Sequence, residues 1–549
     1  MDVATLAAKV EALSAQMQQL LVAYESEVAA RKAETKARLA AEAEVERLRG
    51  LYTEALERCR KLELGIVGRK AERLSGDEAQ LTLSVLGTLL GERELESGRN
   101  GTKTVKEHER RPPTGRKPLP EELPRVEIEI LPDEVKREGL DAFERIGEEV
   151  AEVVERRRAS MVVVRVHRPK FRRKDREPYG ETKIEIGSVP DLPIPRGLAG
   201  PGLLADTITK RFCDHLPLHR QEQIFAREGL PLARSTICGW HRSLADLCRP
   251  LIEAMWDEAK QRAAYLLVDA TGVLVQAKDK CRHGHFWVAI APELHVLFWY
   301  SAKHDGAAVD AVLDGYEGYL VADAHSVYDH LYADGTIVEV GCWAHGRRYF
   351  YKALSSEPER AREGLAMIGE LFAIERTLKT LTPKKRKKER LKRSKVVLDT
   401  FFAWCHHQAE TALDDTPLAK ALGYVLNQRK ALERFLEDGR LPIHNNRSER
   451  ELRREAVGRK NWLFVGNDEA AEVNTTFISL IASCQMHGIE PYGYLRDLLC
   501  LLPLWPRSRI LELAPAYWRQ TLEQQDAQQR LAANVFRKVA LGELMPHEE

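Results

Sequence analysis

The chain has few cysteines, almost no net charge and no long apolar run, and each shortage excludes a class of protein. Its nine cysteines are an odd number, and no two of them form a C-x-x-C pair. A disulfide framework is therefore not expected, and a reducing compartment fits better. The longest apolar runs, such as residues 498–505, are far too short to span a bilayer, and no basic-then-apolar leader opens the sequence. We expect a soluble, cytoplasmic protein with no membrane partner.

The net charge is only +1, although 30% of the residues are charged. Acidic and basic residues are segregated along the chain, so nucleic-acid binding must come from local basic patches and not from an overall basic protein. With 549 residues and 44% hydrophobic content, the chain is long enough for about three or four domains with real cores.

The N-terminal region, residues 1–95, is predicted to be helical and to contain a coiled coil. Leu6, Val10, Leu13 and Met17 alternate spacings of four and three, which is the seam of a coiled coil. The alternative is an amphipathic helix on the protein's own body. A helix of about 60 residues would reach about 90 Å, too long for most bodies, so we favour self-association.

A Pro-rich and basic linker is predicted next, over residues 96–122. After it, the sequence predicts a small α+β module over residues 123–190. Its expected parts are a strand at residues 126–130, a helix at residues 142–156 and a strongly β-branched strand at residues 161–166.

Residues 191–260 have the spacing of a helix-turn-helix. The prediction is a helix at residues 219–228, a Gly-Leu-Pro turn, and a second helix that Ser235 caps. Helical pairs of this kind also occur without DNA, so both interpretations stay open. If DNA binds here, the contacting side chains are expected to be Arg234, Ser235 and Arg242.

Two aspartates, Asp269 and Asp323, each follow a short apolar run of strand character. The order of elements in residues 261–353 is strand, strand, strand, helix, strand, helix, strand, helix, which predicts a mixed sheet covered by helices. In a ribonuclease-H-like arrangement the first and fourth strands lie side by side, which would bring the two aspartates together. The alternative is that each aspartate only caps the turn after its strand.

A helical block is predicted for residues 354–441, as an insertion within the same domain. It contains the run PKKRKKERLKRSK, in which nearly all the charge has one sign. This favours phosphate contact through Lys384, Lys385 and Arg386, although a solvated face remains the alternative. The domain then resumes over residues 442–496, and a helical C-terminal tail follows over residues 497–549.

The stretch HNNRSERELRREAVGRKNWLFVG, residues 444–466, is predicted to begin a helix. Asn446 and Glu449 have the spacing of a capping box. Glu449 also lies beside a basic edge, so capping or ion pairing competes with a role in catalysis.

These residues carry a resemblance to a known family. NNRSERELRREAVGRKNWLFVG, GCWAHGRRYF (341–350), GRKPLPEELPR (115–125) and the stretch at 198–240 are similar to transposases of the IS66 insertion-sequence family. The resemblance covers almost the whole chain. It implies a multidomain α+β protein whose ribonuclease-H-like domain holds a DDE triad, here Asp269, Asp323 and Glu449. Cys342 and His345 resemble a C-x-x-H pair of related transposases.

Two departures from the family accompany the resemblance. Ala270 stands where family members usually have Glu, and no cysteine lies between Cys59 and Cys213, which excludes the usual zinc finger. We therefore expect no zinc, and we expect the small α+β module in place of that finger.

The expected activity is hydrolysis of the phosphodiester at the ends of the insertion sequence, followed by joining of the 3′-hydroxyl to target DNA. Two Mg²⁺ or Mn²⁺ ions, about 3.5 to 4 Å apart, would be held by the triad. Transposon-end DNA and target DNA are the expected partners, with helper proteins of the same element as further candidates. The alternatives are an inactive transposase-derived DNA-binding protein and a ribonuclease-H-like nuclease without strand transfer. Besides the residues named above, the supporting residue is Asn446, and the candidate DNA contacts are Arg447, Arg450, Arg453, Arg459 and Lys460.

Overall fold

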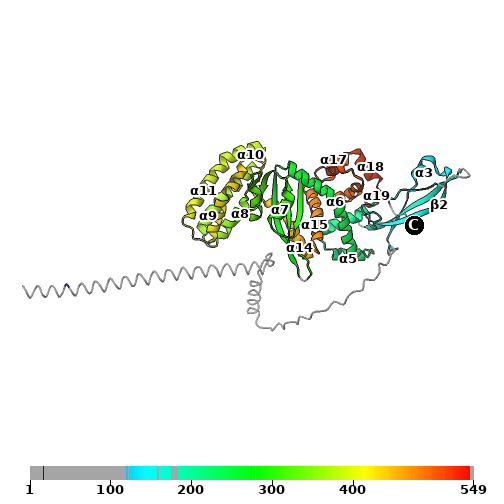
Figure 1. Cartoon of the computed structure of the whole chain (residues 1–549), viewed down its shortest axis with the longest axis horizontal. Helices are drawn as coiled ribbons and strands as arrows, with labels where there is room; N and C mark the ends of the chain where they lie inside the picture. The colour runs from blue at the N-terminus through cyan, green and yellow to red at the C-terminus, as the bar shows by residue number, and fades with distance from the viewer. Residues whose placement is uncertain are drawn as a thin grey trace, which may run out of the picture. The chain divides into compact units, whose positions relative to one another are not determined.

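The computed structural model describes residue 17 and residues 119–121, 123–157, 160–174, 183–278 and 280–544 (Figure 1). The chain forms two compact units, and one comprises residues 1–110, 352–362 and 416–418. In its described part, this unit consists of Met17, which lies in a helix, and short parts of helices α8, α9 and α12. The predicted coiled coil and most of the predicted linker lie outside the described residues. The second unit contains the two sheets and the other helices that follow.

The first sheet along the chain is small, with strand order β1-β3-β2 and with β4 paired to β3. Strand β1 runs parallel to β3, whereas β2 and β4 run antiparallel to it. A short helix and a 3-10 turn connect β1 to β2. The elements are β1 (Arg125–Glu129), α3 (Asp133–Glu138), η2 (Leu140–Ala142), β2 (Phe143–Arg157), β3 (Ser160–Arg173) and β4 (Ile184–Ile186).

The helix predicted for residues 142–156 is wrong, because this segment is strand β2. Its glutamates and alanines favour a helix locally, but pairing with β3 decides the conformation. Each of three glutamates on β2 meets an arginine of β3: the pairs are Glu144–Arg172, Glu149–Arg168 and Glu152–Arg165. Such cross-strand pairs stabilise a sheet by roughly 0.2–1 kcal/mol each.

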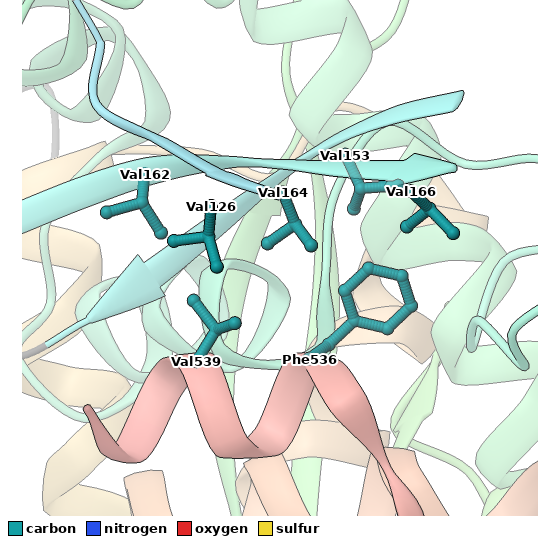
Figure 2. Close-up of a cluster of buried hydrophobic side chains, with 7 residues drawn as sticks. All are labelled: Val126, Val153, Val162, Val164, Val166, Phe536 and Val539. Carbon is teal, nitrogen blue, oxygen red and sulfur yellow. The ribbon is translucent and has the colours of Figure 1, made fainter. Parts of the chain in front are cut away.

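The C-terminal helix α19 (Val535–Leu541) closes the core of this small sheet. Figure 2 shows Phe536 and Val539 of α19 pointing toward valines of β1, β2 and β3. Both side chains are fully buried, and burial of such a side chain contributes about 1.5–3 kcal/mol. The predicted tail is helical, but its last helix belongs to the core of the small module. The elements after residue 490 are α16 (Pro491–Leu501), η6 (Leu502–Leu504), η7 (Arg507–Leu513), α17 (Trp518–Glu523), α18 (Gln525–Ala533) and α19.

Three helices connect the small sheet to the larger one: α4 (Pro201–Phe212), α5 (Leu218–Arg227) and α6 (Arg234–Arg262). The pair α5 and α6 has the predicted helix-turn-helix order, and Gly229 in the turn has φ of 83°. The predicted cap by Ser235 is wrong, since α6 begins one residue earlier, after Ala233. A carboxylate oxygen of Glu222 on α5 accepts a hydrogen bond from the Arg234 N–H at 3.3 Å, which supplies a partner at the start of α6.

The larger sheet has five strands in the order β7-β6-β5-β8-β9. Strands β5, β8 and β9 are parallel, while β6 runs antiparallel to β5 and to β7. The first and fourth strands in chain order therefore lie side by side, as predicted. The elements are β5 (Tyr265–Val275), β6 (Arg282–Ala291), β7 (His295–Ser301), α7 (Gly306–Leu313), β8 (Gly318–Val321), η3 (Ser326–Tyr332), β9 (Ile337–Val340) and α8 (Trp343–Ala353).

Helix α15 (Asp468–Met486) covers the edge strand β7. The hydroxyls of Ser483 and Ser479 accept hydrogen bonds from the Val296 and Phe298 N–H groups, at 3.0 and 2.8 Å. These serines provide partners for an edge that would otherwise expose unpaired backbone groups. In the described part of the chain, no helix is long and apolar enough to cross a membrane.

The block predicted to be helical consists of helices and the turns that connect them. Arg390, within the basic run, is buried and forms an ion pair with Glu375 at 2.7 Å, so part of that run stabilises the fold. Helix α14 follows the block and returns the chain to the larger sheet. The elements are α9 (Pro358–Leu378), α10 (Pro383–Glu389), η4 (Arg390–Ser394), α11 (Lys395–Ala409), α12 (Pro417–Asn427), α13 (Arg429–Glu433), η5 (Arg434–Leu436) and α14 (Asn446–Trp462).

Candidate active site

Asp269 and Asp323 lie at the same end of neighbouring parallel strands. Leu267 of β5 pairs with Val321 of β8, and each aspartate follows two residues later. Asp323 comes just after the end of β8, as predicted. The prediction that β5 ends at Asp269 is wrong, because β6 continues to pair with β5 as far as Val275.

Asp269 lies in a negatively charged and largely buried environment. Burial raises the pKa of Asp269 to about 7, and the charges of Asp323 and Glu449 act in the same direction. The Ala270 N–H, which donates to Asp269 Oδ1 at 2.8 Å, and the Arg348 guanidinium both oppose this rise of the pKa. The three predicted carboxylates therefore lie near enough to influence one another.

Glu449 reaches this region from helix α14. Its Oε1 accepts a hydrogen bond from Arg348 Nη2 at 2.9 Å and lies 3.8 Å from His345 Nε2. The predicted capping box is wrong: Asn446 is the first residue of the helix, Asn445 is the residue before it, and neither caps it through a side chain. Of the two structural alternatives, capping is excluded, whereas an ion pair does exist, with Arg348 of α8.

Asn445, which the sequence analysis missed, fixes three segments around the carboxylates. It is buried, and its Nδ2 donates to the Val268 carbonyl oxygen at 2.8 Å, directly before Asp269. Its backbone N–H donates to Cys342 Sγ at 3.2 Å. The Ser448 hydroxyl donates to its Oδ1 at 2.7 Å. The His-Asn-Asn stretch contains the signal, but the prediction names the second asparagine, Asn446, which is exposed.

The predicted Cys-x-x-His pair lies at the start of α8. Cys342 is buried, and burial raises the pKa of its thiol. Burial lowers the pKa of His345, and Arg348 lowers it further. The buried Nδ1 of His345 has no hydrogen-bond partner among the described residues. Within the described ranges, no three His, Cys, Asp or Glu side chains converge closely enough to hold one metal ion. The expectation of no zinc stays a prediction.

A row of contacting aromatic rings beside Asp323 was not predicted either. The buried Trp287 stacks on His304 with ring centroids 4.7 Å apart, and His304 contacts His325 at 4.5 Å. Burial lowers the pKa of His304, and the charge of Asp323 partly offsets this. The histidines are scattered in the sequence, so only the strand order reveals the cluster.

The predicted DNA contacts on α14 divide into two groups. The Arg459 guanidinium donates to the Thr271 hydroxyl at 3.2 Å and to the Gly272 carbonyl, so it braces β5 just beyond Asp269. The others form no ion pair within the described part of the chain, and three of them are exposed. These exposed residues are Arg450, Arg453 and Lys460; Arg447 is half-buried.

The predicted DNA-contacting side chains of the helix-turn-helix region are exposed, and both arginines form ion pairs within the protein. Arg234 forms an ion pair with Glu222 at 3.2 Å, and Arg242 forms one with Glu469 at 2.5 Å. Ser235 is exposed within α6.

The predicted DNA contacts of the basic run also divide into exposed residues and one residue that the fold uses. Lys384 and Lys385 are exposed. Arg386 instead donates hydrogen bonds to several backbone carbonyls of neighbouring turns, so its guanidinium is used by the fold. The acceptors are Leu378, Lys379, Leu381 and Gly439.

Three family models match the chain. The model described as "Transposase IS66 family" matches residues 196–473, which contain all three carboxylates. The "IS66 C-terminal element" matches residues 479–516. A model described as "Transposase C of IS166 homeodomain" matches residues 54–128, most of which lie outside the described residues.

Similar proteins occur in Sinorhizobium fredii (strain NBRC 101917 / NGR234). The uncharacterized protein y4hP is 28% identical over 491 residues, which cover 84% of this chain and 88% of that protein. The uncharacterized protein y4qI is 28% identical over 522 residues, covering 89% and 94%.

Proposed function

Because the chain belongs to the IS66 transposase family, we propose that it is a DDE transposase whose reaction centre consists of Asp269, Asp323 and Glu449. It binds the ends of its insertion sequence, hydrolyses a phosphodiester there, and joins the freed 3′-hydroxyl to target DNA. The proposal includes a ribonuclease-H-like identity for the five-stranded sheet.

One observation carries this proposal. Two aspartates at equivalent positions on neighbouring parallel strands come within electrostatic reach of Glu449, which lies on helix α14, 180 residues after Asp269 in the sequence. Carboxylates that repel one another in a largely buried place cost stability, so such clusters mark functional sites. The strand order β7-β6-β5-β8-β9 supports the assignment of the sheet.

The donor set suits divalent cations. Carboxylate oxygens are the ligands that Mg²⁺ and Mn²⁺ prefer, and burial together with the neighbouring charges raises the pKa of Asp269, which a cation would reverse. In the described structure these three carboxylates do not converge on one ion. Asp269, Asp323 and Glu449 would hold the cations once Glu449 exchanges its contact with Arg348 for one of them. When bound, the cations supply charge neutralisation at the phosphoryl group and activation of water.

The remaining groups position these carboxylates. Asn445 holds β5 next to Asp269, and Arg459 holds the same strand at Thr271 and Gly272. The side chain of residue 270 is not needed for this arrangement, since Ala270 contributes its backbone N–H to Asp269. The departure at Ala270 is therefore compatible with activity.

The DNA is proposed to lie along exposed cations of α14, namely Arg450, Arg453 and Lys460, with Lys384 and Lys385 as further contacts. None of the three residues on α14 forms an ion pair with a described residue, so each is available to a phosphate. Self-association through the N-terminal region remains part of the proposal.

The test is cleavage of labelled DNA from the borders of the reading frame, in Mg²⁺, by wild type and by Glu449→Gln. Loss of several kcal/mol of transition-state stabilisation should lower the rate by about a hundredfold to a thousandfold, while DNA binding is kept. The control is Glu451→Gln, on the same helix, where the carboxylate pairs with Arg454. Near-normal cleavage by Glu449→Gln would remove Glu449 from the reaction centre.

A further inference from the structure

The C-terminal end of α14 carries an exposed apolar corner that the proposed reaction centre does not use. Leu463 and Phe464 are 64% and 41% exposed, and Leu274 of β5 is exposed at 39%. Single apolar side chains on a surface are ordinary, whereas a group of them marks a binding surface. We call these three residues the apolar corner.

The backbone of the apolar corner is strained. Leu463 has φ of 64° and ψ of −51°, and the Phe464 N–H donates to the Trp462 carbonyl at 2.8 Å. This is the γ-turn with positive φ, which is rare and costs a residue with a side chain about 1–3 kcal/mol. Glycine would adopt it without that cost, so a leucine here indicates that the side chain has a use outside the fold.

Backbone hydrogen bonds to β5 hold the segment that follows the strained turn. The Val465 N–H donates to the Leu274 carbonyl, and the Gln276 N–H donates to the Val465 carbonyl, both at 2.8 Å. Val465 and Val275 pair in parallel, and both are buried. Because successive side chains in extended backbone alternate, Phe464 and Leu274 project to the opposite side, toward solvent. The corner is therefore a rigid projection.

A basic stripe leads along α14 to this corner. Positions 446, 450, 453, 457 and 460 are all exposed, at the three- and four-residue spacing of one helix face, and none is acidic. Arg450, Arg453 and Lys460 supply its charge and form no ion pair with any described residue. Arg454, beside the stripe, pairs with Glu451 instead. Unpaired cations in a row next to an apolar projection suit a phosphate backbone next to stacked bases.

We propose that the apolar corner is a wedge that inserts Leu463 and Phe464 between base pairs of duplex DNA, whose phosphates lie along the basic stripe. The wedge adds a detail to the proposed function, and it rests on that function because the function identifies the DNA that is bound. Asp269 and Leu274 are five residues apart on β5, about 17 Å at 3.4 Å per residue. The unstacked step therefore lies about five base pairs from the cleaved phosphodiester, since base pairs are about 3.4 Å apart.

The experiment uses the full-length protein and duplexes from the borders of the reading frame, with 2-aminopurine placed at successive steps. Wild-type protein should increase the fluorescence at steps about five base pairs from the cut. The variant Leu463→Gly/Phe464→Ala should lose this increase and bind the intact duplex about tenfold more weakly. A duplex already mismatched at that step should restore its binding. Leu504→Ala, which removes an exposed leucine outside both the corner and the stripe, is the control.

Folding is not at risk in this variant, because both side chains are exposed and glycine relieves the positive φ. The fluorescence measurement needs only binding, so it tests the wedge even if no DNA is cleaved, and absence of cleavage by wild type counts against the proposed function alone. The wedge is wrong if the variant unstacks DNA as wild type does. It is also wrong if light scattering shows that the variant loses mass, since the corner would then join copies of the chain.

Discussion

The two sheets of the molecule differ in how most of the acidic side chains discussed above are paired. In the small sheet, glutamates of β2 meet arginines of β3 across the strands, as Glu144 meets Arg172. In the larger sheet, Asp269 and Asp323 follow paired residues of parallel strands and form no ion pair with any described residue. Glu449, which approaches them, forms an ion pair with Arg348 and lies 3.8 Å from His345 Nε2.

This difference separates structural charge from functional charge. Exposed cross-strand pairs need no other partner, and each contributes little to stability. Burial, together with the charges of Asp323 and Glu449, raises the pKa of Asp269, and such unpaired carboxylates lower the stability of the fold until a cation arrives. The small sheet is stabilised by packing and by surface ion pairs, whereas the proposed reaction centre of the larger sheet is expected to lower its stability.

The largest effect on the free energy of unfolding is expected from Phe536→Ala, in the core of the small sheet. It removes the aromatic ring between α19 and the small sheet and should lower the free energy of unfolding by about 3–5 kcal/mol. Cleavage by protein that remains folded should be unchanged, because the carboxylates belong to the other sheet. Thermal unfolding and cleavage at low temperature test this, with the partly buried Val535→Ala as the milder control. Loss of cleavage by folded Phe536→Ala would show that the small sheet contributes to the reaction.

The sequence predicted the larger sheet better than the small one, for a physical reason. Runs such as residues 286–290 are apolar enough to be buried strands in any context, so their type and order were correct. Residues 142–156 are rich in glutamate and alanine, and only the partner strand β3 makes them extended. A local pattern cannot show which distant segment will pair with it.

The same limit applies to the candidate site. Asp269 and Asp323 follow local apolar runs, so they could be identified from sequence, although their proposed role is still untested. Asn445 acts through contacts with Val268 and Cys342, more than 100 residues away, and it was missed. The strained turn at Leu463 was missed too, because nothing in the stretch NWLFVG indicates positive φ.

A smaller effect is expected from Glu155, a carboxylate of the small sheet that has no ion pair with a described residue. Its Oε1 accepts from the Leu203 N–H at 2.8 Å, at the start of α4. Burial raises the pKa of Glu155 to about 8, against backbone N–H groups that lower it. The folded state therefore holds a proton that the unfolded state has released between about pH 4.5 and 8. Its contribution to stability is present at low pH and is lost as the pH rises through this window.

Replacement by glutamine keeps an acceptor and removes the titration. The stability of wild type relative to Glu155→Gln should therefore fall from pH 5 to pH 8, with at most about 1.4 kcal/mol for each unit of pKa difference. Unfolding in urea at several pH values measures this. Glu144→Gln, which is exposed and paired with Arg172, should show no such trend. A difference that is constant with pH would mean that Glu155 has the same protonation state in the folded and in the unfolded protein.

The most direct measurement is thermal unfolding of wild type and Asp323→Asn, without DNA, as MgCl₂ or MnCl₂ is added. Without cation, Asp323→Asn should be at least as stable as wild type, because one repelling carboxylate is gone. At a cation concentration of about 100 times Kd, wild type should gain about 2.7 kcal/mol and the variant little. Asp310→Asn, which removes an exposed carboxylate paired with His330, should behave as wild type. Equal gains by wild type and Asp323→Asn, or no gain by either, would contradict the claim that these carboxylates are placed together to hold cations.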